Sequence, residues 1–219
     1  MANKLTCSPV LEREALAPVL EPITVAPSGD VIMVVGKEKR RMRVHSVILS
    51  AASPVFKVMF GPNFSEGNHL STVDPKEIPL PKDNEDALQT IFYIVHFRPD
   101  AINDPPSPDL LLQVAIAANK YGFVNALKHP LQAWINDSAI QEPEKLWKLV
   151  MASFWIQKED YFKSTTKKTP GMGWGAIPPS RVYMDDQMPP DAASRFFGKA
   201  LSYSGTLCIH LQRLILFKQ

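Results

Sequence analysis

The sequence predicts an α+β fold in which a small β-sheet lies beneath a cluster of short helices, followed by a helical pair and a disordered C-terminal tail. Residues 30–45 pass from a continuous apolar run to an alternating one, which is typical of a hairpin. Two Ser-Pro dipeptides begin later segments with helical spacing of apolar residues. Eight residues between 170 and 190 are proline or glycine, and this density interrupts regular structure.

The composition is that of a chain able to bury a core. Of its 219 residues, 45% are hydrophobic and 21% are charged, which is unlike a chain disordered throughout. The formal net charge of +2 argues against bulk electrostatic binding of nucleic acid. The two cysteines stand near opposite ends of the sequence, which excludes a disulfide-rich scaffold and a cysteine-based zinc site.

Two features of the sequence bear on cellular location. The first residues carry no apolar stretch of the kind found in secretory signals. No run of about 18 apolar residues is present, and the longest one, 207–216, is interrupted by polar side chains. We therefore expect an intracellular protein without a membrane span, located in the cytoplasm, the nucleus or both.

The first regular structure expected is a hairpin. Residues 1–27 contain four prolines and are expected to form an N-terminal arm. The β-branched run 31–35 predicts a strand buried on both faces. The alternating run 41–45 predicts a strand with one solvent-exposed face, and the polar residues 37–40 predict the turn between the two strands.

Two short helices and an edge strand are predicted next. Ser46 is a candidate N-cap for an apolar helix over 47–52. The Ser-Pro pair at 53–54 supplies a cap and a first-turn proline for a second helix, which Gly61 ends. The short apolar segment 77–80 contains one proline and is flanked by two more, so it is expected at an edge where a missing N–H is tolerated.

Longer helices follow. Asp83 is expected to open the clearest of them, and the Ser-Pro pair at 107–108 begins the next, which Gly122 ends. Pro130 is expected to kink the helix after that. A helical pair is predicted within 138–168. In the helix that Asp83 is expected to open, the apolar stripe consists of Leu88, Ile91, Phe92 and Val95.

Several of these segments carry sequence motifs in a fixed order. They are an Asp-led apolar strand at 30–36, a His-x-x-Ile-Leu step at 45–49, a Ser-x-x-Phe-x-x-Met-Phe run at 53–60, Ile-Pro-Leu at 78–80, and Ala-Ala-Asn-Lys-Tyr at 117–121. Together these motifs resemble the signature of the BTB/POZ domain. The resemblance covers about half of the chain.

The resemblance implies a BTB/POZ fold over 28–137 and a helical extension over 138–168, and the proline and glycine content predicts a linker and tail over 169–219. The extension is similar to that of fungal BTB proteins and is too short for the full helical domain of Kelch-type adaptors. No Kelch repeat, zinc finger or other effector repeat follows it in this sequence. The Pro-rich loop 98–109 departs from the family pattern, which has a compact turn and a small strand there.

BTB domains are protein–protein interaction modules that commonly form homodimers through their first helix, helped by an exchanged N-terminal arm. The resemblance therefore implies a homodimer. It points to Asp30, Val47 and Leu49 as dimer-interface residues. For Asp30, a plain turn or capping role is the alternative.

Family members that dock on cullin scaffolds carry a hydrophobic-x-Glu motif three residues after a Met-Phe pair. Here Met59 and Phe60 are followed, after three residues, by Phe64 and Glu66. The resemblance makes these four residues a candidate cullin-type site. An exposed aromatic side chain on a loop offers a large apolar anchor, and a glutamate suits a basic groove. The alternative is that Phe64 folds back under the loop as part of the core while Glu66 is simply solvated.

Other conspicuous residues have structural explanations. His45 has no sequence neighbour that would make it a catalytic base, so we expect it to pack or form a hydrogen bond. The remaining histidines lack metal-ligand spacing. Five basic residues between 37 and 43 fit a solvated hairpin, with a nuclear-import or nucleic-acid signal as the alternative. The dinucleotide-like spacing at 171–176 has no strand before it, and prolines follow it.

The sequence therefore predicts a non-catalytic, homodimerising protein–protein interaction module without cofactor or metal ion. Its specific role is expected to be that of a substrate adaptor for a cullin-RING ubiquitin ligase, which also binds a substrate protein. The alternative is a nuclear scaffold or transcription-associated dimer whose basic hairpin is the import signal. An enzyme is disfavoured because no nucleophile–base pair, metal cluster or phosphate-binding loop is recognisable.

Overall fold

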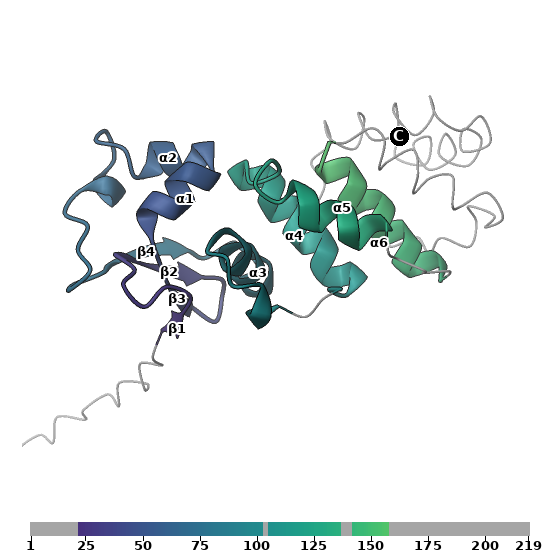
Figure 1. The fold of residues 1–219 in the computed structure, drawn as a ribbon, viewed down its shortest axis with the longest axis horizontal. Helices are drawn as coiled ribbons and strands as arrows, with labels where there is room; N and C mark the ends of the chain where they lie inside the picture. The colour runs from purple at the N-terminus through teal and green to yellow at the C-terminus, as the bar shows by residue number, and fades with distance from the viewer. Residues whose placement is uncertain (1–21, 103–104, 137–141, 158–219) are drawn as a thin grey trace, which may run out of the picture.

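The computed structural model describes residues 22–102, 105–136 and 142–157 (Figure 1). It confirms the predicted α+β class, with one mixed sheet and several helices. The elements in chain order are β1 (Ile23–Thr24), β2 (Val31–Val35), β3 (Arg40–Val44), α1 (Ser46–Ala52), α2 (Pro54–Met59), the 3₁₀ turn η1 (Ser65–Gly67), β4 (Lys76–Leu80), α3 (Glu85–Val95), the 3₁₀ turn η2 (Pro99–Ala101), α4 (Pro108–Tyr121), α5 (Lys128–Asn136) and α6 (Pro143–Trp155).

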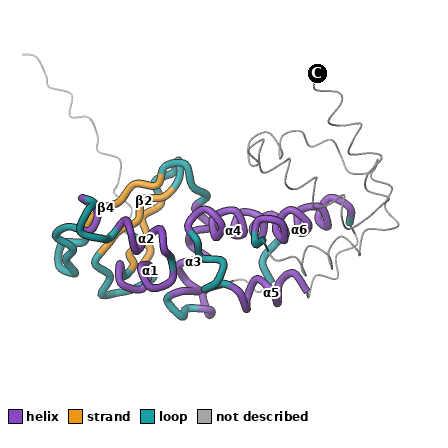
Figure 2. Tube along the Cα trace, turned by 90° about the horizontal axis from the view of Figure 1, so that it is seen from above, coloured by secondary structure: helices purple, strands orange, loops and turns teal. Residues whose placement is uncertain are grey.

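In the described part of the chain, the sheet lies at one end and a group of helices lies at the other. The sheet lies next to α1 and α2 at one end, α3 lies in the centre, and α4, α5 and α6 form the other end (Figures 1 and 2). The α3 helix contacts both α1 and α4, so it connects the two ends. One hydrophobic cluster runs through all of these elements and includes the sheet.

The sheet has the strand order β1-β3-β2-β4. The predicted hairpin is confirmed: β2 and β3 are antiparallel, with Val31 opposite Val44. The β4 strand lies at an edge, as Pro79 within it requires, and runs parallel to β2 after the crossover through α1 and α2. At the other edge the short β1 pairs in parallel with β3, an element that the sequence did not predict.

The α1 helix begins differently from the prediction. Ser46 is its first residue rather than its N-cap, and His45 occupies the cap position without a side-chain capping bond. The carboxylate of Asp30 takes over this role, because Oδ1 accepts from the Ser46 N–H at 2.7 Å and Oδ2 accepts from the Ser46 hydroxyl at 2.6 Å. The hairpin brings the residue before β2 next to the first residue of α1, so the cap comes from outside the local sequence.

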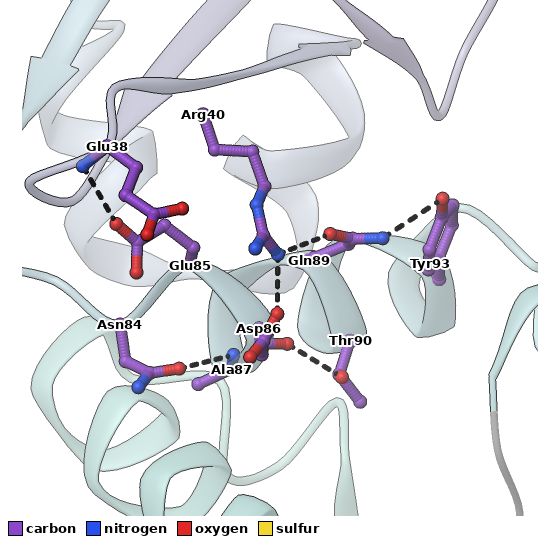
Figure 3. Close-up of polar contacts among 9 residues, drawn as sticks. All are labelled: Glu38, Arg40, Asn84, Glu85, Asp86, Ala87, Gln89, Thr90 and Tyr93. Carbon is purple, nitrogen blue, oxygen red and sulfur yellow. Dashed lines mark hydrogen bonds and ion pairs between the residues drawn. The ribbon is translucent and has the colours of Figure 1, made fainter.

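The predicted starts of two later helices also need correction. Asn84, not Asp83, caps α3, since its side chain accepts from the Ala87 N–H at 2.9 Å (Figure 3). The α5 helix begins at Lys128, so Pro130 lies in its first turn and does not kink its middle. Backbone N–H groups in a first turn have no intrahelical partner, and a proline is tolerated there.

Asp83 instead joins the start of α3 to the end of α4. Its side chain is only 7% exposed and accepts from Lys120 Nζ at 2.6 Å and from the Tyr121 hydroxyl at 2.8 Å. Burial, together with the neighbouring Asp83 carboxylate, raises the pKa of the Tyr121 phenol. Tyr121 therefore remains a neutral hydrogen-bond donor at this junction.

The α6 helix confirms the predicted helix after Pro143 and packs along α4 (Figure 2). Polar contacts join the helices: Lys148 Nζ lies 2.6 Å from Asp109 Oδ1, and Asn119 Nδ2 donates to the Trp155 carbonyl at 2.8 Å. The second helix expected within the 138–168 extension, the tail 169–219, and residues 1–21 of the arm lie outside the described residues.

Candidate protein-binding site

The loop between α2 and β4 carries the candidate residues. Phe60 is partly buried and stacks on Phe56, with the ring centroids 5.7 Å apart. Met59 also packs against the core. Phe64, by contrast, is 46% exposed, so its ring does not fold under the loop. The Met-Phe pair therefore anchors the loop, and Phe64 is the member that can reach another protein.

This loop is held in place by contacts to its backbone. Lys76 of β4 donates through Nζ to the carbonyl oxygens of Ser65 and Asn68, the latter at 3.3 Å. Gly67 lies so close to the preceding turn that a Cβ atom there would be 2.4 Å from the Phe60 carbonyl oxygen. Phe64 is therefore presented on a pre-ordered segment, which lowers the entropic cost of binding through it.

Glu66 lies in the same turn and is half-buried. One carboxylate oxygen, Oε2, accepts from the Ser65 hydroxyl at 3.1 Å. Within the part of the chain that the structure describes, Glu66 has no basic partner. Its charge is thus available to a cation on another molecule, next to the exposed ring of Phe64.

Exposed apolar side chains extend beyond the loop. On α2, Val55 is 39% and Val58 is 59% exposed, and on α1 Val47 is 71% exposed. Each of these helices buries its opposite side in the core, through Leu49 in α1 and Phe56 in α2. The two helices therefore offer apolar contacts on the outside of the molecule.

The three residues expected at a dimer interface have different surroundings. Leu49 is completely buried within the subunit, so it is not accessible to a second copy. Asp30 binds Ser46, as described above, which matches the capping alternative for this residue. Val47 is the one whose side chain faces solvent.

The basic hairpin is largely engaged within the fold. Arg40 binds Asp86 and Gln89 of α3 at 2.5 and 2.8 Å (Figure 3). Arg41 pairs with Glu77 across the sheet, and Arg43 donates to two backbone carbonyl groups. These contacts give the three arginines structural roles, and Lys37 and Lys39 in the turn remain exposed.

A histidine pair was not foreseen from the sequence, since its members are 51 positions apart. The rings of His45 and His96 stack with centroids 5.8 Å apart. The backbone N–H of His45 donates to His96 Nε2 at 3.0 Å, and His96 Nδ1 donates to the Phe92 carbonyl at 2.8 Å. His45 also contacts the Ser28 hydroxyl through Nε2 at 3.0 Å. The pair thus joins the start of α1, the end of α3 and the segment before β2.

This geometry requires a neutral His96, because Nε2 must accept a hydrogen bond. Burial lowers the pKa of His96 from its ordinary value of 6.5, and the nearby His45 lowers it further, while the bond to Phe92 opposes them. The folded state binds this proton less readily than the unfolded state. The contribution of neutral His96 to stability is therefore fully present above its ordinary pKa and is lost as the pH falls through the pKa of His96 in the folded state.

We therefore predict that the urea concentration at the midpoint of unfolding decreases as the pH is lowered from about 7.5 to about 5.5, the range around the ordinary histidine pKa. His96→Gln keeps an acceptor near the Nε2 position but cannot be protonated, so its midpoint should fall less over the same range. Equal losses in the two proteins would contradict the assignment of this pH dependence to His96.

Metal binding and membrane crossing can be judged for the described residues. Their His, Cys, Asp and Glu side chains form no group of three or more that is arranged to hold a metal ion. None of the helices in these ranges combines the length and apolar character that a bilayer crossing requires.

A family model for the BTB/POZ domain matches residues 28–130 of the chain. No curated protein matches it.

Proposed function

Residues 28–130 make this chain a BTB/POZ-domain protein, a type of protein–protein interaction module, and from this premise we propose that it forms a homodimer that docks on a cullin scaffold. In this proposal the chain is a non-catalytic substrate adaptor of a cullin-RING ubiquitin ligase. The docking site consists of Phe64 and Glu66, supported by Met59 and Phe60. A substrate protein would bind outside the BTB domain.

The observation that carries the docking site is the exposure of Phe64 on a constrained loop. Phe56, Phe92 and Phe123 are fully buried in the core, whereas the ring of Phe64 is held outside it, which favours a contact with another protein. Aromatic anchors dominate the binding energy of many interfaces because they bury much area with few rotatable bonds. Glu66 has no basic partner among the described residues, and its charge adds a preference for a basic neighbour.

Phe64→Ala is expected to weaken binding to the N-terminal region of a cullin by about 30-fold or more, because an interface anchor contributes about 2 kcal/mol. Isothermal titration calorimetry on the full chain measures this. Glu66→Gln, which keeps shape but removes charge, should weaken binding less. Val73→Ala is the matched control, since Val73 is 93% exposed in the same loop but lies outside the motif. Unchanged affinity in Phe64→Ala would remove the proposed docking site.

For self-association, multi-angle light scattering of the full chain is expected to give the mass of a dimer. Val47→Asp should shift the chain toward monomer, because it places a charge on the exposed side of α1 that a symmetric partner would cover. Val58→Asp, on α2, is the control and should leave the mass unchanged. A wild-type monomer at high concentration would contradict the dimer.

A further inference from the structure

The described part of the chain contains two Ser-Pro dipeptides, and in both of them the serine caps the start of a helix. Ser53 is the N-cap of α2 and Ser107 is the N-cap of α4, and in each case the next residue is a proline in the first helical turn. Each serine oxygen accepts a backbone N–H three residues ahead, from Phe56 at 3.0 Å and from Leu110 at 3.2 Å.

The two hydroxyl groups differ in what else surrounds them. Ser53 is 1% exposed, and its hydroxyl donates to the Tyr121 carbonyl at 2.5 Å. Ser107 is exposed, and its hydroxyl finds no acceptor among the residues that the structure describes. Only the second serine has a side chain that an enzyme can reach and a proton that is not already committed to the fold.

We propose that Ser107 is a phosphorylation site for a proline-directed protein kinase. Its backbone, with φ −60° and ψ 152°, is already extended in the polyproline II manner, which suits binding of a segment in a peptide groove. Pro108, the residue after Ser107, has no backbone N–H. A kinase pocket that offers no hydrogen-bond acceptor at this position therefore selects a proline there. The exposed Pro105 lies two positions before the acceptor.

In the reaction, Ser107 Oγ forms a bond to the γ-phosphorus of ATP while the bond from that phosphorus to the ADP oxygen breaks, and the hydroxyl proton passes to the kinase's base. The product carries about −1.5 to −2 charge at neutral pH. That charge lies at the start of α4, two residues before Asp109, which attracts Lys148 of α6. Phosphorylation thus strengthens the attraction between the N-terminal end of α4 and α6.

The test is to incubate the folded full chain with ATP and a purified proline-directed kinase, and to locate phosphate by peptide mass spectrometry. Phosphate is expected on Ser107 and not on Ser53. Pro108→Ala keeps the hydroxyl and the cap but should lower the rate of Ser107 phosphorylation by about tenfold or more, through loss of the selected proline. An unmodified Ser107, equal labelling of Ser53, or an unchanged rate in Pro108→Ala would each overturn the proposal.

The structural consequence is tested separately on the phosphorylated chain. Amide hydrogen exchange in α6 is expected to be slower than in the unmodified chain, because the helix is held more firmly against α4. Lys148→Met should remove this slowing while leaving phosphorylation of Ser107 intact. Exchange in α6 that does not respond to the phosphate would refute the proposed coupling between the two helices.

Discussion

Replacing Phe56 by alanine is expected to lower the free energy of unfolding by about 3–5 kcal/mol, the usual cost of removing a buried aromatic ring. Phe56 is fully buried at the inner side of α2. Its ring connects α2 to α3, α4 and the segment after α4. The rings around it, with centroid distances, are those of Tyr121 (5.0 Å), Phe123 (5.6 Å), Phe60 (5.7 Å) and Phe92 (6.4 Å).

Urea unfolding followed by circular dichroism measures the effect. Phe64→Ala is the matched control, because it removes the same side chain from a half-exposed position eight residues later in the chain. It should change the free energy of unfolding by no more than about 0.5 kcal/mol, as is usual at surfaces. Similar losses in the two variants would mean that the aromatic cluster does not hold α2 to the rest of the core.

Ser53→Ala is expected to cost about 2–4 kcal/mol, the second largest effect. The hydroxyl performs two tasks in a buried position: it accepts from the Phe56 N–H and donates to the Tyr121 carbonyl. Loss of the N-cap costs about 1 kcal/mol. The carbonyl at the end of α4 would also be left buried without this partner, which costs about 1–3 kcal/mol more.

Ser107→Ala separates these two contributions, because Ser107 caps its helix in the same way but is exposed. Its loss of stability should be about 1 kcal/mol, the value for the cap alone. Denaturant unfolding of both variants under one set of conditions gives the comparison. If Ser53→Ala is no more destabilising than Ser107→Ala, the bond to Tyr121 contributes nothing to the fold.

Most of the secondary structure could be predicted from the sequence because its signals are local. The strand 31–35 and its hairpin, the Ser-Pro starts of α2 and α4, and the end of α4 at Gly122 agree with the structure. Gly122 has a positive φ of 74°, the conformation that glycine adopts most easily at a helix end. In each case the decisive contact spans only a few residues of chain.

Two of the mispredicted helix starts, those of α1 and α3, depend on distant partners. Ser46 resembles an N-cap in sequence, but the carboxylate of Asp30 from the other side of the hairpin occupies the site. Asp83 resembles the first residue of α3, but it is drawn to Lys120 and Tyr121 at the end of α4. The local signal is overridden where a carboxylate gains several hydrogen bonds from another element.

The sequence alone thus predicted the α+β class, most of the elements in their order and a resemblance to the BTB/POZ domain, whose family model matches residues 28–130, and it placed Phe64 in a candidate binding motif. Only the tertiary structure decided that Phe64 is exposed while Leu49 is not, and that His45 meets His96. The reason is physical: hydrophobic periodicity specifies which residues share a face, but which faces are covered depends on how separate elements pack together.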